Sequence, residues 1–248
     1  MAPCSASRFL SPRRYPRSRR LPSILIIDDD PDLLGVCRVG LEAFGYDLHT
    51  AETGNDGLTQ TAIRAPDVVV LDLGLPDLDG VEVCRRIRQW SRAPIIVLSA
   101  DGSEDRKVEA FDRGADDYMT KPFGMRELNA RLRVALRHRT VGADDDQPTE
   151  ITVGPLHLDL VHHEATLEGQ PLDLTPKEFD FLAYLAHNVG KVCTRRLILE
   201  HVWGPGYAKE QQYLKVYAYR LRRKLKDERG RLLQSDPSVG YRLVAPGD

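Results

Sequence analysis

Three short runs of consecutive apolar residues constrain the first half of this chain more than any other feature. They span residues 24–27, 68–71 and 94–98, and a polar residue follows each one. Strands without polar alternation are typical of a parallel sheet that helices cover on both faces. Weaker strand patterns occur at 46–50 and 116–119, and helical periodicity is found near residues 31–44, 54–64, 80–90, 104–113 and 124–138. Five β-α units in this order predict a doubly wound α/β fold.

The polar residues that follow these strands indicate the chemistry of the first half. In a doubly wound sheet the site forms at the carboxyl ends of the strands, where this chain carries Asp28, Asp29, Asp30, Asp72, Ser99 and Lys121. Clustered carboxylates repel one another unless a cation lies between them, and hard oxygen ligands suit Mg²⁺ rather than zinc. A hydroxyl and an ammonium group can bind phosphoryl oxygens, and a carboxylate can be the nucleophile that gives an aspartyl phosphate.

Two other interpretations compete with this one. An aspartate at a strand end is commonly a helix N-cap or a turn former, and Asp30 can be only the cap of the next helix. A phosphatase with an Asp-x-Asp nucleophile is a rival for Asp72, but residue 74 is glycine rather than a second acid. Several polar residues in register at one edge of the sheet favour the phosphoryl site.

The second half of the chain has a different pattern of elements. Residues 140–150 lack apolar periodicity and contain Gly, Pro and three consecutive Asp, which predicts a linker. Short alternating segments follow, and Thr175 is then a predicted N-cap with proline at the first helical position. After two more helical patterns, residues 232–244 read strand, turn, strand, with Pro237 and Gly240 at the turn. Strands, three helices and a terminal hairpin predict an α+β winged helix-turn-helix.

The formal net charge of −2 conceals segments of opposite charge. Residues 23–140 hold 15 basic and 21 acidic side chains, whereas residues 195–231 hold 11 basic and 4 acidic ones. A locally basic segment predicts a nucleic-acid contact. Within it, helical spacing places one apolar face at Leu214, Ala218, Leu221 and Leu225. The opposite face of that helix is either an ordinary solvated surface or a DNA-reading surface. The candidate DNA-contacting residues are Lys215, Tyr219, Arg220, Arg222, Arg223 and Lys224.

The motifs of the first half resemble the receiver domain of bacterial response regulators. They are IIDDDP at 26–31, VVLDLGLP at 69–76, LSA at 98–100 and YMTKPF at 118–123. The resemblance implies a flavodoxin-like (βα)5 receiver domain at residues 23–139, with Asp72 as the acceptor of a phosphoryl group from a sensor histidine kinase. It also implies that Ser99 and Lys121 contact that group, and that Tyr118 turns inward when Ser99 moves toward it. Mg²⁺ would be bound by Asp29, Asp72 and the backbone carbonyl of Gly74, and by Asp28 mostly through water.

The chain is also similar to one subfamily of these regulators, the OmpR/PhoB type. That resemblance implies a symmetric homodimer formed by the fourth helix, fifth strand and fifth helix of the receiver. Lys107 would pair with the partner's Glu127, and Asp117 with the partner's Arg131. The usual third pair joins the position of Asp116 to a basic residue where this chain has His138.

The second half, predicted to form one domain at residues 151–246, resembles the winged-helix effector domain of the same subfamily along residues 151–244. The motifs are LTPKEF at 174–179, VWG at 202–204, LRRKL at 221–225 and GYR at 240–242. The resemblance implies that α-helical Lys215, Arg220, Arg222 and Arg223 and the wing residue Arg242 contact DNA. It also places Trp203 in the core and the loop 204–209 toward RNA polymerase. Motifs at 73–77, 120–125 and 213–217 resemble the branch that regulates potassium-uptake operons, although Ser238 occupies a wing position where glycine is usual.

These observations predict a two-domain DNA-binding regulator rather than an enzyme. A kinase would phosphorylate Asp72, and the dimer would bind repeated operator half-sites in the cytoplasm; no stretch approaches the ~18 apolar residues of a membrane helix. The alternatives are a Mg²⁺-dependent phosphohydrolase and a phosphorylation-independent DNA-binding protein with a vestigial receiver. Residues 1–22, with six Arg and no acid, are either a disordered extension or an arm that adds non-specific DNA affinity.

Overall fold

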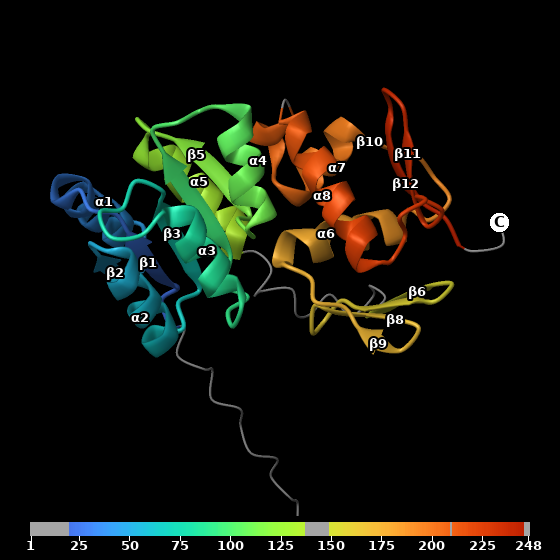
Figure 1. Ribbon diagram of the computed structural model, residues 1–248, viewed down its shortest axis with the longest axis horizontal. Helices are drawn as coiled ribbons and strands as arrows, with labels where there is room; N and C mark the ends of the chain where they lie inside the picture. Colours follow the sequence, from blue (N-terminus) through green and yellow to red (C-terminus); the bar gives the residue numbers. More distant parts are fainter. Residues whose placement is uncertain (1–19, 137–148, 209, 246–248) are drawn as a thin grey trace, which may run out of the picture.

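The first module is a parallel sheet between two layers of helices. The computed structural model describes residues 20–136, 149–208 and 210–245. The sheet has the order β2-β1-β3-β4-β5 (Figure 1), with strands β1 (Ser23–Ile27), β2 (Asp47–Ala51), β3 (Val68–Asp72), β4 (Ile95–Ser99) and β5 (Asp117–Thr120). The helices are α1 (Pro31–Ala43), α2 (Gly54–Arg64), α3 (Gly80–Arg88), α4 (Glu104–Asp112) and α5 (Met125–Leu136). The predicted doubly wound fold is therefore confirmed.

The three apolar runs form the centre of this sheet. Every residue of β1, β3 and β4 is buried, because alternate side chains point to the two helical layers. Ile24 and Ile26 pack in a cluster with apolar residues of α1 and α5, whereas Leu25 and Ile27 pack in a second cluster with residues of α3 and α4. This double burial explains why the strands lack the polar alternation of a one-sided sheet.

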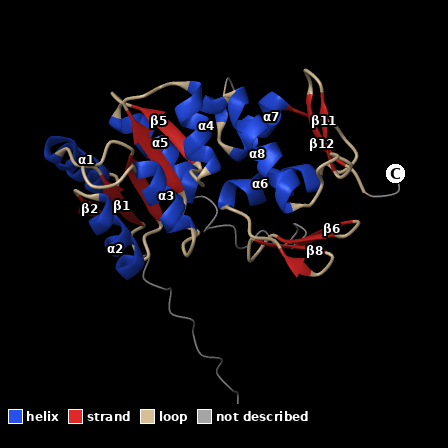
Figure 2. Ribbon diagram, viewed as in Figure 1, coloured by secondary structure: helices blue, strands red, loops and turns tan. Residues whose placement is uncertain are grey.

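The second module combines two small antiparallel sheets with three helices (Figure 2). Strands β6 (Glu150–Val153), β7 (Leu156–Asp159), β8 (Glu164–Leu167) and β9 (Gln170–Pro171) form one sheet. The helices are α6 (Pro176–His187), α7 (Arg195–Val202) and α8 (Gln211–Lys224), and a 3-10 turn spans Pro205–Tyr207. The second sheet, in the order β10-β12-β11, contains β10 (Cys193–Thr194), β11 (Leu233–Asp236) and β12 (Gly240–Leu243). The predicted winged helix-turn-helix is confirmed.

Two residues explain the shape of the terminal hairpin. Ser238 has φ 67°, a left-handed conformation that glycine adopts more easily, which accounts for the usual glycine at this wing position. A Cβ atom on Gly240 would lie 1.8 Å from the carbonyl oxygen of Cys193. Only glycine therefore allows β12 to approach β10 this closely.

The two modules pack directly against each other. Helix α4 of the first module lies beside α8 of the second, and the apolar cluster around Leu25 continues into the second module. No helix among the described residues is long and apolar enough to cross a membrane. The predicted extension at 1–22 and linker at 140–150 fall almost entirely outside the described residues.

Candidate functional site

Three carboxylates meet at the carboxyl edge of the first sheet. β1 and β3 are parallel and pair Ile27 with Leu71, so Asp28 and Asp72 follow at the same level. Oxygens of Asp28, Asp29 and Asp72 all lie within 4.8 Å of one another. Asp28 and Asp72 are buried, whereas Asp29 is exposed. Such a group of oxygen donors, open to solvent on one side, suits a hard cation that keeps some of its water.

Lys121 supplies the positive charge that this cluster needs. Its Nζ atom lies 2.7 Å from Oδ2 of Asp28 and 3.3 Å from Oδ2 of Asp72. Burial raises the pKa of Asp72 above its ordinary value, and the negative charge of Asp28 adds to that rise, while Lys121 acts in the opposite direction. The lysine therefore favours the ionised form of Asp72, which is the form that can act as a nucleophile.

The loop after β3 is fixed to its neighbours by specific contacts. A Cβ atom on Gly80 would lie 2.3 Å from the carbonyl oxygen of Asp72, so glycine lets α3 begin directly against that strand end. Asp77 accepts hydrogen bonds from the backbone amides of Gly54, at 2.7 Å, and Asn55, at 2.9 Å. These contacts anchor the loop containing Gly74 to the start of α2. Sequence pattern alone gives no sign of this role of Asp77, because its partners are distant in the chain.

The remaining residues of the predicted site lie on the same edge or beside it. Ser99 ends β4 and is buried, and its Oγ atom accepts a hydrogen bond from the amide of Asp101. Tyr118 is 3% exposed and donates its hydroxyl to the carbonyl oxygen of Asp101 at 2.5 Å. Asp30 caps α1 by accepting hydrogen bonds from two of its first amides, which agrees with a capping role.

The charged residues predicted to bridge a dimer are paired within one chain here. Arg131 lies 2.8 Å from Asp117 and 2.7 Å from Glu127, and Nζ of Lys107 lies 5.9 Å from the centre of the Tyr118 ring. Asp116 is 1% exposed and forms an ion pair with Arg88 of α3. His138, the residue that was expected opposite Asp116, lies outside the described residues. Asp116 is thus a core residue in this arrangement rather than a surface charge.

The second module covers that charged surface with aromatic side chains. The hydroxyl of Tyr213 lies 3.2 Å from Oδ1 of Asp117, and Tyr207 also hydrogen-bonds to that carboxylate. Tyr217 donates to the carbonyl oxygen of Ala115 at 3.0 Å, and the indole of Trp203 donates to that of Asp116 at 3.1 Å. We call this packing of the second module on α4 and β5 the closed arrangement.

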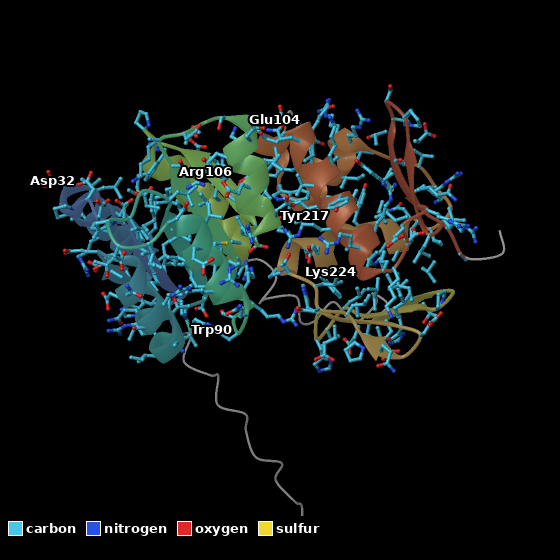
Figure 3. All side chains as sticks on the ribbon, in the orientation of Figure 1. Asp32, Trp90, Glu104, Arg106, Tyr217 and Lys224 are labelled. Atoms are coloured by element: carbon cyan, nitrogen blue, oxygen red, sulfur yellow. The ribbon has the colours of Figure 1, made fainter. Side chains whose placement is uncertain are left out.

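The aromatic rings of the closed arrangement form one buried cluster. Phe111 of α4 lies with its ring centre 4.4 Å from that of Tyr213, and the rings of Trp203 and Tyr217 are 4.9 Å apart. All four side chains are 1% exposed or less. Figure 3 shows Tyr217 at the boundary between the two modules. Trp203, predicted to be core at the end of α7, is therefore buried between the modules.

The predicted DNA-reading residues divide into two groups. Residues of the first group form ion pairs or hydrogen bonds with neighbouring residues. Glu178 of α6, which has 0% exposure, pairs with Arg220 at 2.8 Å and with Lys224 at 2.5 Å. Arg222 donates to the carbonyl oxygen of Leu233 at 3.0 Å, and Arg242 donates to Gln234 at 2.7 Å. The second group is exposed on α8 and contains Lys215, Tyr219 and Arg223.

Comparison with known proteins identifies the class to which these two modules belong. Residues 24–133 match the family model of the response regulator receiver domain, and residues 169–243 match that of the C-terminal domain of transcriptional regulatory proteins. The chain belongs to the response regulators of the OmpR/PhoB type, which join a receiver to a winged-helix DNA-binding domain.

Two relatives within that class share most of this chain. The transcriptional regulatory protein KdpE of Mycobacterium tuberculosis is 46% identical over 224 residues, which cover 90% of this chain and 99% of the relative. The KDP operon regulator KdpE of Escherichia coli is 42% identical over 226 residues, covering 90% of this chain and all of the relative. Among solved structures, a mutant of RitR superposes with a TM-score of 0.72 at 26% identity, covering 90% of this chain and 99% of that one. The chain is thus a DNA-binding response regulator similar to KdpE.

Proposed function

We propose that Asp72 accepts a phosphoryl group from a sensor histidine kinase and that this modification controls DNA binding. The observation that carries the proposal is the cluster of Asp28, Asp29 and Asp72 around Lys121, one strand away from Ser99. In the same chain, the exposed cations of α8 lie in a second module that covers the expected dimer surface. One residue can thus control whether the two modules remain together.

The transfer requires an ionised aspartate and a charge balance around it. An oxygen of Asp72 forms a bond to phosphorus while the nitrogen–phosphorus bond of phosphohistidine breaks, and the released imidazole takes up a proton from solvent. Asp28, Asp29, Asp72 and the carbonyl of Gly74 are the proposed ligands of Mg²⁺, which would lower the repulsion between phosphoryl oxygens and carboxylates. Lys121 and Ser99 are the proposed donors to the phosphoryl oxygens.

Dimerisation and the closed arrangement require the same surface. Asp117 and Arg131 already bond to Tyr207 and to each other within one chain, so a partner subunit can pair with them only after the second module has moved away. Phosphorylation then favours one of two existing states, the open dimer, over the closed monomer. Lys107 and Glu127 are proposed to join that dimer surface, and Asp116 to support it from inside.

The exposed group on α8 supplies the proposed DNA contacts. Lys215, Tyr219 and Arg223 are exposed at roughly one-turn spacing, whereas Glu178 holds Arg220 and Lys224 from within the same module. These two ion pairs persist when the modules separate, because all three residues belong to the second module. Arg222 and Arg242 support the wing and reach DNA only if their contacts to Leu233 and Gln234 are exchanged.

The proposed target is a potassium-uptake operon of the kdp type, and the support is the identity shared with the KdpE proteins. The loop 204–209 is proposed to meet RNA polymerase after opening, since Tyr207 leaves Asp117 at that step. As a DNA-binding protein served by a kinase, it is proposed to act in the cytoplasm. Asp72 is proposed to be modified once per activation rather than to turn over a substrate, so free phosphomonoesters should not be hydrolysed.

Sedimentation with Mg²⁺, with and without beryllofluoride, tests this function. Wild-type protein should change from monomer to dimer when the phosphoryl analogue is added, and Asp72→Ala should remain monomeric under both conditions. Binding to a kdp-type operator, measured in parallel, should tighten only where the dimer forms. If neither protein responds, phosphorylation-driven dimerisation is wrong and the vestigial receiver becomes the better interpretation. Steady turnover of a phosphomonoester would instead support a phosphohydrolase.

A further inference from the structure

The closed arrangement leaves part of the recognition helix free. Tyr213 and Tyr217 of α8 face the receiver and are buried, but Lys215, Tyr219 and Arg223 remain exposed, Tyr219 at 58%. In the closed arrangement these three residues therefore remain open to a DNA duplex. Binding of a duplex to this face then depends on the charges of the surface beside α8.

That surface is the exposed side of α4. Four acidic residues recur on it at helical spacing, and all four are exposed; we call Glu104, Asp105, Glu109 and Asp112 the α4 acidic row. The row lines one open groove, which α8 lines with Tyr219, Arg220, Arg223 and Lys224. Of these cations, Arg220 and Lys224 are already paired with Glu178. Figure 3 shows Glu104 at the end of α4 that lies close to the second module. Acidic receiver residues thus lie beside the cations that would meet DNA.

We propose that the α4 acidic row excludes DNA from the closed monomer. A duplex carries one negative charge per ~1.7 Å of its axis, and phosphates on the exposed face of α8 would come within a screening length of about 8–10 Å of the row. This inference rests on the proposed function, because it concerns DNA binding by α8.

The charges within the row are not equivalent. Glu109 forms an ion pair with Arg106 at 2.6 Å, which weakens its field, and Arg106 is also paired with Asp79. Arg113 lines the groove too and adds one positive charge, so the wall formed by α4 remains negative overall. Glu104, Asp105 and Asp112 are therefore the residues to neutralise.

The test uses the unphosphorylated full-length protein and a generic DNA duplex of about 25 base pairs. The triple variant Glu104→Gln, Asp105→Asn, Asp112→Asn should bind this duplex about tenfold more tightly than wild type at 50 mM salt, measured by fluorescence anisotropy. The gain should shrink at 300 mM salt. A matched triple variant with the same change in net charge, Glu42→Gln, Asp47→Asn, Asp56→Asn, alters exposed acids of α1, β2 and α2 and should gain less than twofold.

The shape of the free protein separates exclusion from opening. The sedimentation coefficient of the α4 variant should equal that of wild type, because the aromatic contacts of the closed arrangement are unchanged. Equal affinity gains in the two triple variants, or a gain accompanied by a more extended monomer, would overturn the inference. Wild-type protein activated with beryllofluoride provides the reference: if it binds no DNA, the proposed function fails, whereas normal activated binding with no α4 effect contradicts only the exclusion.

Discussion

The carboxyl edge of the receiver sheet, which carries Asp28 and Asp72, and the interface between the two modules are built in different ways. At the edge, charged and hydroxyl side chains from distant parts of the chain meet because the ends of parallel strands lie side by side. At the interface, donors from the second module, among them Trp203 and Tyr217, reach main-chain carbonyls of the receiver. The first arrangement follows from the geometry of one sheet. The second depends on how two separate folds meet, which is a property of neither fold alone.

The largest expected effect concerns Arg88, whose partner Asp116 lies beside the module interface and accepts a hydrogen bond there from the indole of Trp203. Arg88→Ala removes the partner of Asp116 and leaves a buried carboxylate without its counter-charge, which should destabilise the receiver by about 3–5 kcal/mol. Urea unfolding followed by far-UV circular dichroism measures the loss. The control is Arg85→Ala, a partly exposed position on the same helix paired with Glu82, where a loss above about 1 kcal/mol is not expected. Equal losses in the two variants would contradict the core role of Asp116 and favour its assignment to the dimer surface.

The interface itself can be weakened without changing its shape. The double variant Tyr213→Phe, Tyr217→Phe keeps both rings but removes hydroxyl donors to β5 and its preceding loop. At about 1 kcal/mol for each hydrogen bond, the closed arrangement should lose about 2 kcal/mol, or roughly 30-fold in its equilibrium. Sedimentation should show dimers at a correspondingly lower concentration of protein and beryllofluoride. Tyr219→Phe on the exposed face of the same helix should behave as wild type; a similar shift there would contradict the assignment.

The carboxyl edge of the receiver sheet should show the smallest change in stability, and here the substitution should stabilise the protein rather than destabilise it. Because the pKa of Asp72 is raised in the folded protein, its ionised form costs stability, and this cost grows as pH rises above the ordinary carboxyl pKa. Asp72→Asn should therefore raise stability at pH 7 by on the order of 1 kcal/mol. The gain should disappear as pH falls to about 4 and below. Thermal unfolding across this range measures it, and a gain independent of pH would show that ionisation is not the cause.

The sequence predicted the receiver edge well because its signals are local. A polar residue follows each apolar run at this edge, so Asp28, Asp72 and Ser99 could be named from strand ends alone. Helical spacing also predicted the buried face of α8, where Leu214, Ala218 and Leu221 are all buried. These patterns depend on neighbours within one element or one sheet.

The sequence did not predict the contacts that join elements of different modules. The hydroxyls of Tyr207 and Tyr213 meet Asp117 across about 90 positions, and no periodicity links them. The basic run on α8 likewise gave no sign that buried Glu178 would hold Arg220 and Lys224, since the spacing of α6 and α8 is set by packing. The dimer pairs came from resemblance to a family, and the structure describes a single chain in which the same charges are paired differently.

The closed arrangement has a consequence for how the two modules can be exchanged between proteins. Four donors of the second module, Trp203, Tyr213, Tyr217 and Arg220, bond to backbone carbonyl oxygens of the receiver. Any receiver with this fold offers carbonyls at those places, whatever its side chains are. A receiver sequence can therefore diverge, or be replaced by another in a chimera, while these four hydrogen bonds of the closed arrangement are retained.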